Sequence, residues 1–302
     1  MTMRIVLPLL LLFFVAPPIH EKHRPQTDWS KVQIKSTKVA GNVYLLEGAG
    51  GNIGVSVGAD GILIVDDQFA PLADKIRASL KTLGQGKLRF ILNTHWHGDH
   101  TGSNAAFGPE ATIVAHDNVR KRLSTEQRSE FFKSTTPPSQ KEALPVITFD
   151  QSLSVHFNGE EIRAIHFPNG HTDGDSVVFF TTSNVVHLGD DFFAGRFPFV
   201  DLDSGGSVEG LTRNISELIT RIPADAKLIP GHGPISTLED LKTYHRMLVE
   251  TTAIVRDKIA ARKTLDQIKS EGLSAEWNSW GTGFIKTDLW LELIYRSLTA
   301  KK

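Results

Sequence analysis

The run His95–His100, which reads His-Trp-His-Gly-Asp-His, is the feature that most constrains this chain. It follows an apolar segment, residues 88–92, that is typical of a buried strand. In extended backbone, residues two apart project to the same side, so His95 and His97 can bind one ion. The aspartate and last histidine of the run then lie on the following turn, where they can face a second ion. The run therefore predicts a metal-dependent enzyme.

Three further candidate ligands also lie where an apolar, strand-like segment gives way to a Gly-containing loop: His171, Asp190 and His232. Strand ends are where α/β folds assemble their sites, and glycine lets the backbone approach an ion closely. His171 and His232 could each be ordinary loop histidines, but their shared context favours ligands. Asp190 competes with its neighbour Asp191, and we favour Asp190 because it directly follows Gly189.

The candidate donors are imidazoles and carboxylates, and the chain contains no cysteine. This donor set suits zinc in a catalytic site, with one position left open for water. The charge is nearly balanced, with 33 basic and 34 acidic residues among 302. Binding to a nucleic acid needs clustered Lys and Arg, so we expect a small-molecule substrate and no nucleic-acid partner. The oligomeric state is left open.

The first twenty residues resemble an export signal with a short linker. Arg4 supplies a positive start, and residues 5–15 form an apolar core too short to span a bilayer. An uncleaved membrane anchor is the alternative interpretation. We expect a periplasmic or secreted protein that has no stable membrane insertion once the signal is removed.

Strand-like segments followed by a helical pattern occur twice, on either side of a Pro-rich loop at residues 134–145. This repetition predicts two αβ halves stacked sheet to sheet, with the helices outside. A helical pattern then covers residues 238–261, 265–271 (capped by Thr264) and 288–298 (capped by Thr287). We expect a metal-binding domain at residues 32–236, with a C-terminal helical extension at 237–302 packed on it.

The candidate ligands together resemble the pattern of the metallo-β-lactamase superfamily, over roughly residues 40–235. The resemblance implies an α/β fold, a four-layer αβ/βα sandwich, with two metals in a cleft. It assigns three residues to the first metal, three to the second and one as a bridge between them. In that order these are His95, His97 and His171; Asp99, His100 and His232; and Asp190.

The expected activity is that of a binuclear zinc hydrolase. Metal binding lowers the pKa of water from 15.7 to about 7, so a metal-bound hydroxide would cleave a carbonyl ester, lactone or amide, β-lactams included. Asp99 would orient this nucleophile and carry its proton. The alternatives are a phosphodiesterase, a single-iron oxidoreductase similar to persulfide dioxygenases, and a metal-binding protein without turnover.

Several other features have structural interpretations. The segment Gly54–Gly58 matches the letters of a serine-hydrolase elbow, but a further strand follows it where that motif needs a helix, so Ser56 is expected to be a strand residue. Trp96 and the aromatic segment Trp277–Phe284 are expected to pack in the core, with a place in the cleft wall as the alternative for both. Dimerisation is a further alternative for the segment. The remaining histidines of the fold are expected to be structural, with His187 as a possible support for the ligands.

Overall fold

The computed structural model describes residues 27–300, so the expected export signal lies outside the described residues. The chain divides into two units, Met1–Lys31 and Val32–Lys302. Among the described residues, the sheets, the long helices and the candidate ligands all lie in the second unit. Among residues 27–300, no helix has the length and apolar character needed to cross a bilayer.

The first sheet is mixed and has seven strands in the order β1-β2-β3-β4-β5-β6-β9. Strands β1 to β4 are antiparallel neighbours, whereas β4, β5, β6 and β9 run parallel. The bounds are β1 Lys35–Ala40, β2 Val43–Glu47, β3 Ile53–Gly58, β4 Gly61–Val65, β5 Leu88–Asn93, β6 Thr112–His116 and β9 Ile147–Phe149.

The second sheet has five strands in the order β10-β11-β12-β13-β14, with a parallel pair only between β13 and β14. Its strands are β10 Ser152–Phe157, β11 Glu160–His166, β12 Ser176–Phe180, β13 Val185–Phe193 and β14 Lys227–His232. A separate two-stranded hairpin, β7 Gln127–Ser129 with β8 Ser134–Thr136, connects the first sheet's helices to β9.

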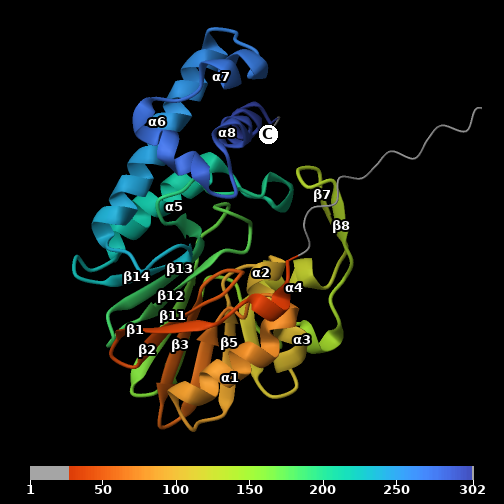
Figure 1. Cartoon of the computed structure of the whole chain (residues 1–302), viewed down its shortest axis with the longest axis vertical. Helices are drawn as coiled ribbons and strands as arrows, with labels where there is room; N and C mark the ends of the chain where they lie inside the picture. The colour runs from red at the N-terminus through yellow and green to blue at the C-terminus, as the bar shows by residue number, and fades with distance from the viewer. Residues whose placement is uncertain (1–26, 301–302) are drawn as a thin grey trace, which may run out of the picture. The chain divides into compact units, whose positions relative to one another are not determined.

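Eight α-helices flank these sheets in the part of the chain that the structure describes. They are α1 Ala73–Leu83, α2 Gly98–Thr101, α3 Asn104–Phe107, α4 Asp117–Leu123, α5 Val208–Arg221, α6 Leu238–Ala260, α7 Leu265–Glu271 and α8 Thr287–Thr299. Figure 1 shows α5, α6 and α8 together on the side of the second sheet and α1 on the side of the first.

The two sheets pack face to face because each contributes apolar side chains to one shared core. That cluster joins Leu63 and Leu92 of the first sheet to Val178 and Ile229 of the second. A second cluster packs the other face of the second sheet against α5, α6 and α8. All five residues of β4 and all nine of β13 are buried, as expected for strands covered on both faces. The four-layer αβ/βα sandwich predicted from the sequence is confirmed.

Several local expectations differ from the structure. The Pro-rich loop contains β8, and the preceding β7 and the edge strands β1 and β9 were not expected. Thr287 was expected to cap the last helix, which was wrong, because α8 begins at Thr287 itself and Lys286 precedes it without a side-chain cap. The strand expected at residues 185–188 continues to Phe193, so Asp190 lies within β13 rather than in the loop expected after it.

The turn between β10 and β11 ties the two sheets together. Asn158 has a left-handed φ of 53°, and its side-chain amide donates to Ser56 Oγ (3.1 Å) and to the Gly61 carbonyl (3.1 Å). Its Oδ1 accepts a hydrogen bond from the Asp60 backbone N–H. Ser56 is fully buried in β3, which agrees with a strand residue and not with an exposed nucleophile.

We predict that Asn158→Ala lowers the free energy of unfolding by about 3 kcal/mol, because it loses three hydrogen bonds and strains a left-handed residue. Asn184→Ala is the matched control, since Asn184 also has a positive φ (52°) but no side-chain hydrogen bond in the structure. It should cost only about 1 kcal/mol. Urea unfolding measures both, and equal losses would show that the link between the sheets contributes nothing.

Candidate metal centre

All seven candidate ligands come to the same edge of the two sheets. His95 and His97 follow β5, and the next turn forms the short helix α2, which carries Asp99 and His100. The other three lie in the second half of the chain: His171 between β11 and β12, Asp190 in β13, and His232 at the end of β14. The strand ends of the two sheets thus bring together residues up to 137 positions apart in sequence.

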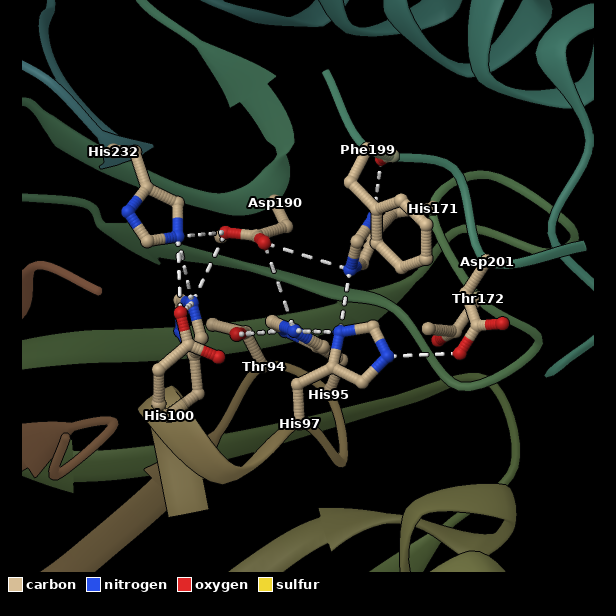
Figure 2. Close-up of polar contacts among 12 residues, drawn as sticks. Thr94, His95, His97, His100, His171, Thr172, Asp190, Phe199, Asp201 and His232 are labelled. Atoms are coloured by element: carbon tan, nitrogen blue, oxygen red, sulfur yellow. Dashed lines mark hydrogen bonds and ion pairs between the residues drawn. The ribbon is translucent and has the colours of Figure 1, made fainter. Parts of the chain in front are cut away.

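The first group consists of His95, His97, His171 and Asp190, whose donor atoms all lie within 4.8 Å of one another. His97 Nδ1 lies 3.1 Å from His95 Nε2 and 2.8 Å from His171 Nε2. Asp190 Oδ2 lies 3.4 Å from His171 Nε2 and 3.8 Å from His95 Nε2. Figure 2 shows these side chains pointing toward one common point.

The second group consists of Asp99, His100 and His232. Nε2 of His232 lies 3.4 Å from His100 Nε2 and 3.3 Å from Asp99 Oδ2. The other oxygen of Asp190, Oδ1, faces this group at 3.1 Å from His100 Nε2 and 3.4 Å from His232 Nε2. The carboxylate of Asp190 therefore lies between the two groups, with one oxygen toward each.

In three of the imidazoles, a hydrogen bond from the outer ring nitrogen fixes which nitrogen faces inward. His97 Nε2 donates to Asp201 Oδ2 (2.8 Å), and His100 Nδ1 donates to Asp66 Oδ2 (2.7 Å). His171 Nδ1 donates to the backbone carbonyl of Phe199 (2.8 Å). Because a neutral imidazole carries one N–H, the inner nitrogen of each ring then presents a lone pair.

These contacts fit metal ions. Inward-facing imidazole nitrogens stand 2.8 to 3.4 Å apart, where two lone pairs would repel each other unless a proton or a metal ion lay between them. Asp190 Oδ1 is buried and makes no hydrogen bond in the structure. A donor set of imidazoles and carboxylates without thiolate suits a catalytic divalent metal.

The electrostatics favour the same conclusion. Burial lowers the pKa of His171 to about 4 and that of His95 well below its usual range, so both are neutral, as ligation requires. Burial alone would also lower the pKa of His232, but Asp190 and Asp99 raise it to about 9. The carboxylates thus draw positive charge into the second group, which is what a divalent cation site needs.

Sequence reasoning missed the residues that orient the ligands. Asp66 directly follows β4, so the strand-end signal used for the ligands could have identified it. Asp201 lies in a loop without any such signal. His187 contacts none of the candidate ligands and instead bonds the Asn52 carbonyl (3.1 Å), as a structural histidine. Asp191 is buried with its Oδ1 3.4 Å from the His171 backbone N–H, so it lies outside both groups.

The two groups open into a cavity of about 730 Å³. The lining includes Asp99, Asp190 and His232, and also Trp96, which packs against the apolar cluster of Ala115, Val119 and Leu123 while it lines the cavity. Trp277 is buried in the core, whereas Phe284, from the same aromatic segment, lines the cavity. Both interpretations of that segment therefore hold, each for a different part. This volume is in the range that holds a small molecule.

A four-layer sandwich with a His/Asp centre at its strand ends defines a metallo-hydrolase class of fold. The model of the metallo-β-lactamase superfamily matches residues 36–264. The chain belongs to this superfamily, and it has two candidate His/Asp metal sites.

Individual relatives are distant. The chain is 29% identical to a probable metallo-hydrolase of Methanocaldococcus jannaschii, over 57% of this chain and 83% of the relative. It spans 40%, 62% and 44% of the lengths of three further relatives. The DIM-1 metallo-β-lactamase structure aligns with a TM-score of 0.59 at 20% identity, over 73% of this chain and 99% of that one. The sec-alkyl sulfatase PisA1 aligns with a TM-score of 0.68 at 13% identity, over 89% of this chain and 51% of that one. These two structures show the shared fold.

We predict that Asp201→Asn weakens metal binding by 10- to 100-fold, because it removes the charged acceptor that orients His97. Asp203→Asn makes the same charge change two residues away, where the carboxylate bonds only the Glu130 backbone N–H, and should leave affinity unchanged. Competition with a chromogenic chelator measures both. Equal affinity of the two variants would contradict a role for Asp201 in orienting His97.

Proposed function

We propose that this chain is a binuclear zinc hydrolase that cleaves a carbonyl ester, lactone or amide of a small molecule. The observation that carries the proposal is the position of Asp190, with one carboxylate oxygen facing each group of candidate ligands. A single-iron oxidoreductase would use the first group alone and would give no purpose to Asp99, His100 and His232. The volume of the cavity supports a small-molecule substrate.

The protein's own residues would hold two ions and orient the reacting groups. When bound, the zinc ions would activate water and polarise the substrate oxygen. His95, His97 and His171 would hold one ion, and Asp99, His100 and His232 the other, with Asp190 shared. Asp99 is the candidate proton carrier, because its Oδ2 faces His232 and its side chain is 27% exposed at the cavity.

Export and a periplasmic or secreted location are part of this proposal. They are supported by the composition of residues 1–16, in which one basic residue precedes a short apolar run.

We predict that the wild-type protein binds about two zinc ions per chain and that His232→Ala binds about one, because the first group stays intact. His245→Ala is the control, since His245 lies on α6, outside both groups, and this variant should still bind about two. Elemental analysis after dialysis measures the stoichiometry. One zinc per wild-type chain would overturn the binuclear assignment.

The function is tested by a hydrolase screen on zinc-loaded protein across β-lactams, lactones, thioesters and phosphodiesters. We expect turnover of at least one carbonyl substrate, its loss on exhaustive chelation and its recovery with added zinc. His97→Ala should abolish it, because His97 contacts both other histidines of the first group. Activity that persists undiminished in His97→Ala, or turnover confined to phosphodiesters, would contradict the proposal.

A further inference from the structure

One wall of the cavity consists of phenylalanines from segments that carry no candidate ligand. Phe132 comes from the β7–β8 hairpin, Phe199 from the loop after β13, and Phe284 from the segment before α8. Ring centroids lie 5.0 Å apart between Phe132 and Phe199 and 6.1 Å apart between Phe132 and Phe284. We call these three residues the aromatic wall.

The aromatic wall reaches the metal centre. The Phe199 ring lies 6.0 Å from the ring of His97 and 5.9 Å from that of His171. Apolar surface is therefore continuous from the first group of ligands outward to Phe284. A group attached to the reacting carbonyl would lie along this surface.

The outer part of the aromatic wall is exposed to solvent. Phe284 is 64% exposed, and Phe132 is half-buried. Exposed aromatic surface is unfavourable in water, at roughly 25 cal/mol per Å². A bound apolar group would cover it, and the cavity that the wall lines is continuous with the catalytic centre.

The hairpin is held over the cavity rather than free. Arg122 of α4 makes a two-pronged ion pair with Asp173, at 2.7 Å for each contact, and also donates to Gln127 at the start of the hairpin (2.9 Å). Asp173 lies two residues after His171. The hairpin that carries Phe132 is thus joined to the loop that carries a candidate ligand, which gives the wall a fixed place beside the centre.

We propose that the aromatic wall binds the apolar arm of the substrate, so that the enzyme prefers carbonyl compounds whose acyl part is an aryl-alkyl or medium-length alkyl chain. This inference rests on the proposed carbonyl hydrolysis and adds the chemical class of the substrate. At the hairpin, the charged side chain that lines the cavity is Arg128, and it is paired with Glu126 (3.1 Å).

The test compares 4-nitrophenyl acetate with 4-nitrophenyl 4-phenylbutanoate, which share a leaving group and differ in the acyl arm. We expect the wild type to favour the longer ester in kcat/KM by at least about tenfold, which corresponds to about 1.4 kcal/mol. Phe132→Ala should lose most of that preference, because its kcat/KM should fall much more on the longer ester than on the acetate. Phe284→Ala should lose part of it, and because Phe284 is exposed this variant is expected to fold normally.

Phe131→Ala is the matched control. Phe131 is on the same hairpin and packs against Phe132 (4.9 Å) and Phe199 (5.1 Å), but it does not line the cavity. Damage to the hairpin would affect both Phe131→Ala and Phe132→Ala, whereas loss of a binding surface would affect Phe132→Ala and leave Phe131→Ala unchanged. Equal loss of preference in the two variants, or a wild type without preference, would overturn the proposal.

A binding measurement separates this inference from the proposed function. Calorimetric titration uses 4-phenylbutanamide, a neutral probe that carries the same arm. The probe should bind the wild type and Phe131→Ala equally, and Phe132→Ala about tenfold more weakly. If no ester is hydrolysed but this difference in affinity is found, the proposed reaction is wrong and the proposed binding role of the aromatic wall is correct. If esters are hydrolysed and the probe binds all variants equally, the proposed binding role is wrong.

Discussion

The metal centre depends on the free-energy cost of burying several electron-donating nitrogen and oxygen atoms close together. The inner nitrogens of His95, His97 and His171 and the carboxylate of Asp190 lie within 4.8 Å of one another, and three of these four residues are buried. Such an arrangement is unfavourable unless positive charge lies between these groups. The outer bonds to Asp201 and the Phe199 carbonyl hold the rings of His97 and His171 in place against that repulsion, and Asp66 holds the ring of His100. The loops that supply these partners are therefore as much a part of the centre as the ligands.

The sequence was sufficient for the sandwich and for the set of candidate ligands because both depend on local patterns. Apolar strands such as β4 and β5 are short, continuous and bounded by glycine or polar turns, which makes them recognisable. The dense run His95–His100 lies just after β5, and the three glycine-flanked residues lie near the ends of β11, β13 and β14. Because these strand ends meet at one edge of the two sheets, the structure brings the residues together.

What the sequence did not reveal depends on tertiary contacts. Strand β1 is mostly exposed and polar, so it carries no burial pattern, and only pairing with β2 makes it a strand. The three-residue strands β7 and β8 are equally polar and short. The role of Asp201 depends on a contact across 104 residues to His97, and nothing local to Asp201 indicates that contact.

The C-terminal helices reach the centre through one loop. Trp290 of α8 stacks on Phe197 (5.6 Å between ring centroids), and the Phe197 backbone N–H donates to the Trp280 carbonyl (3.2 Å). Trp290 is in turn fixed to α6 by a hydrogen bond from its indole N–H to Thr251 Oγ1 (3.1 Å). The same loop carries Phe199 and Asp201, which bond His171 and His97. The extension therefore acts on the metal centre without supplying a ligand, because it fixes the loop that orients two of the imidazoles and forms part of the aromatic wall.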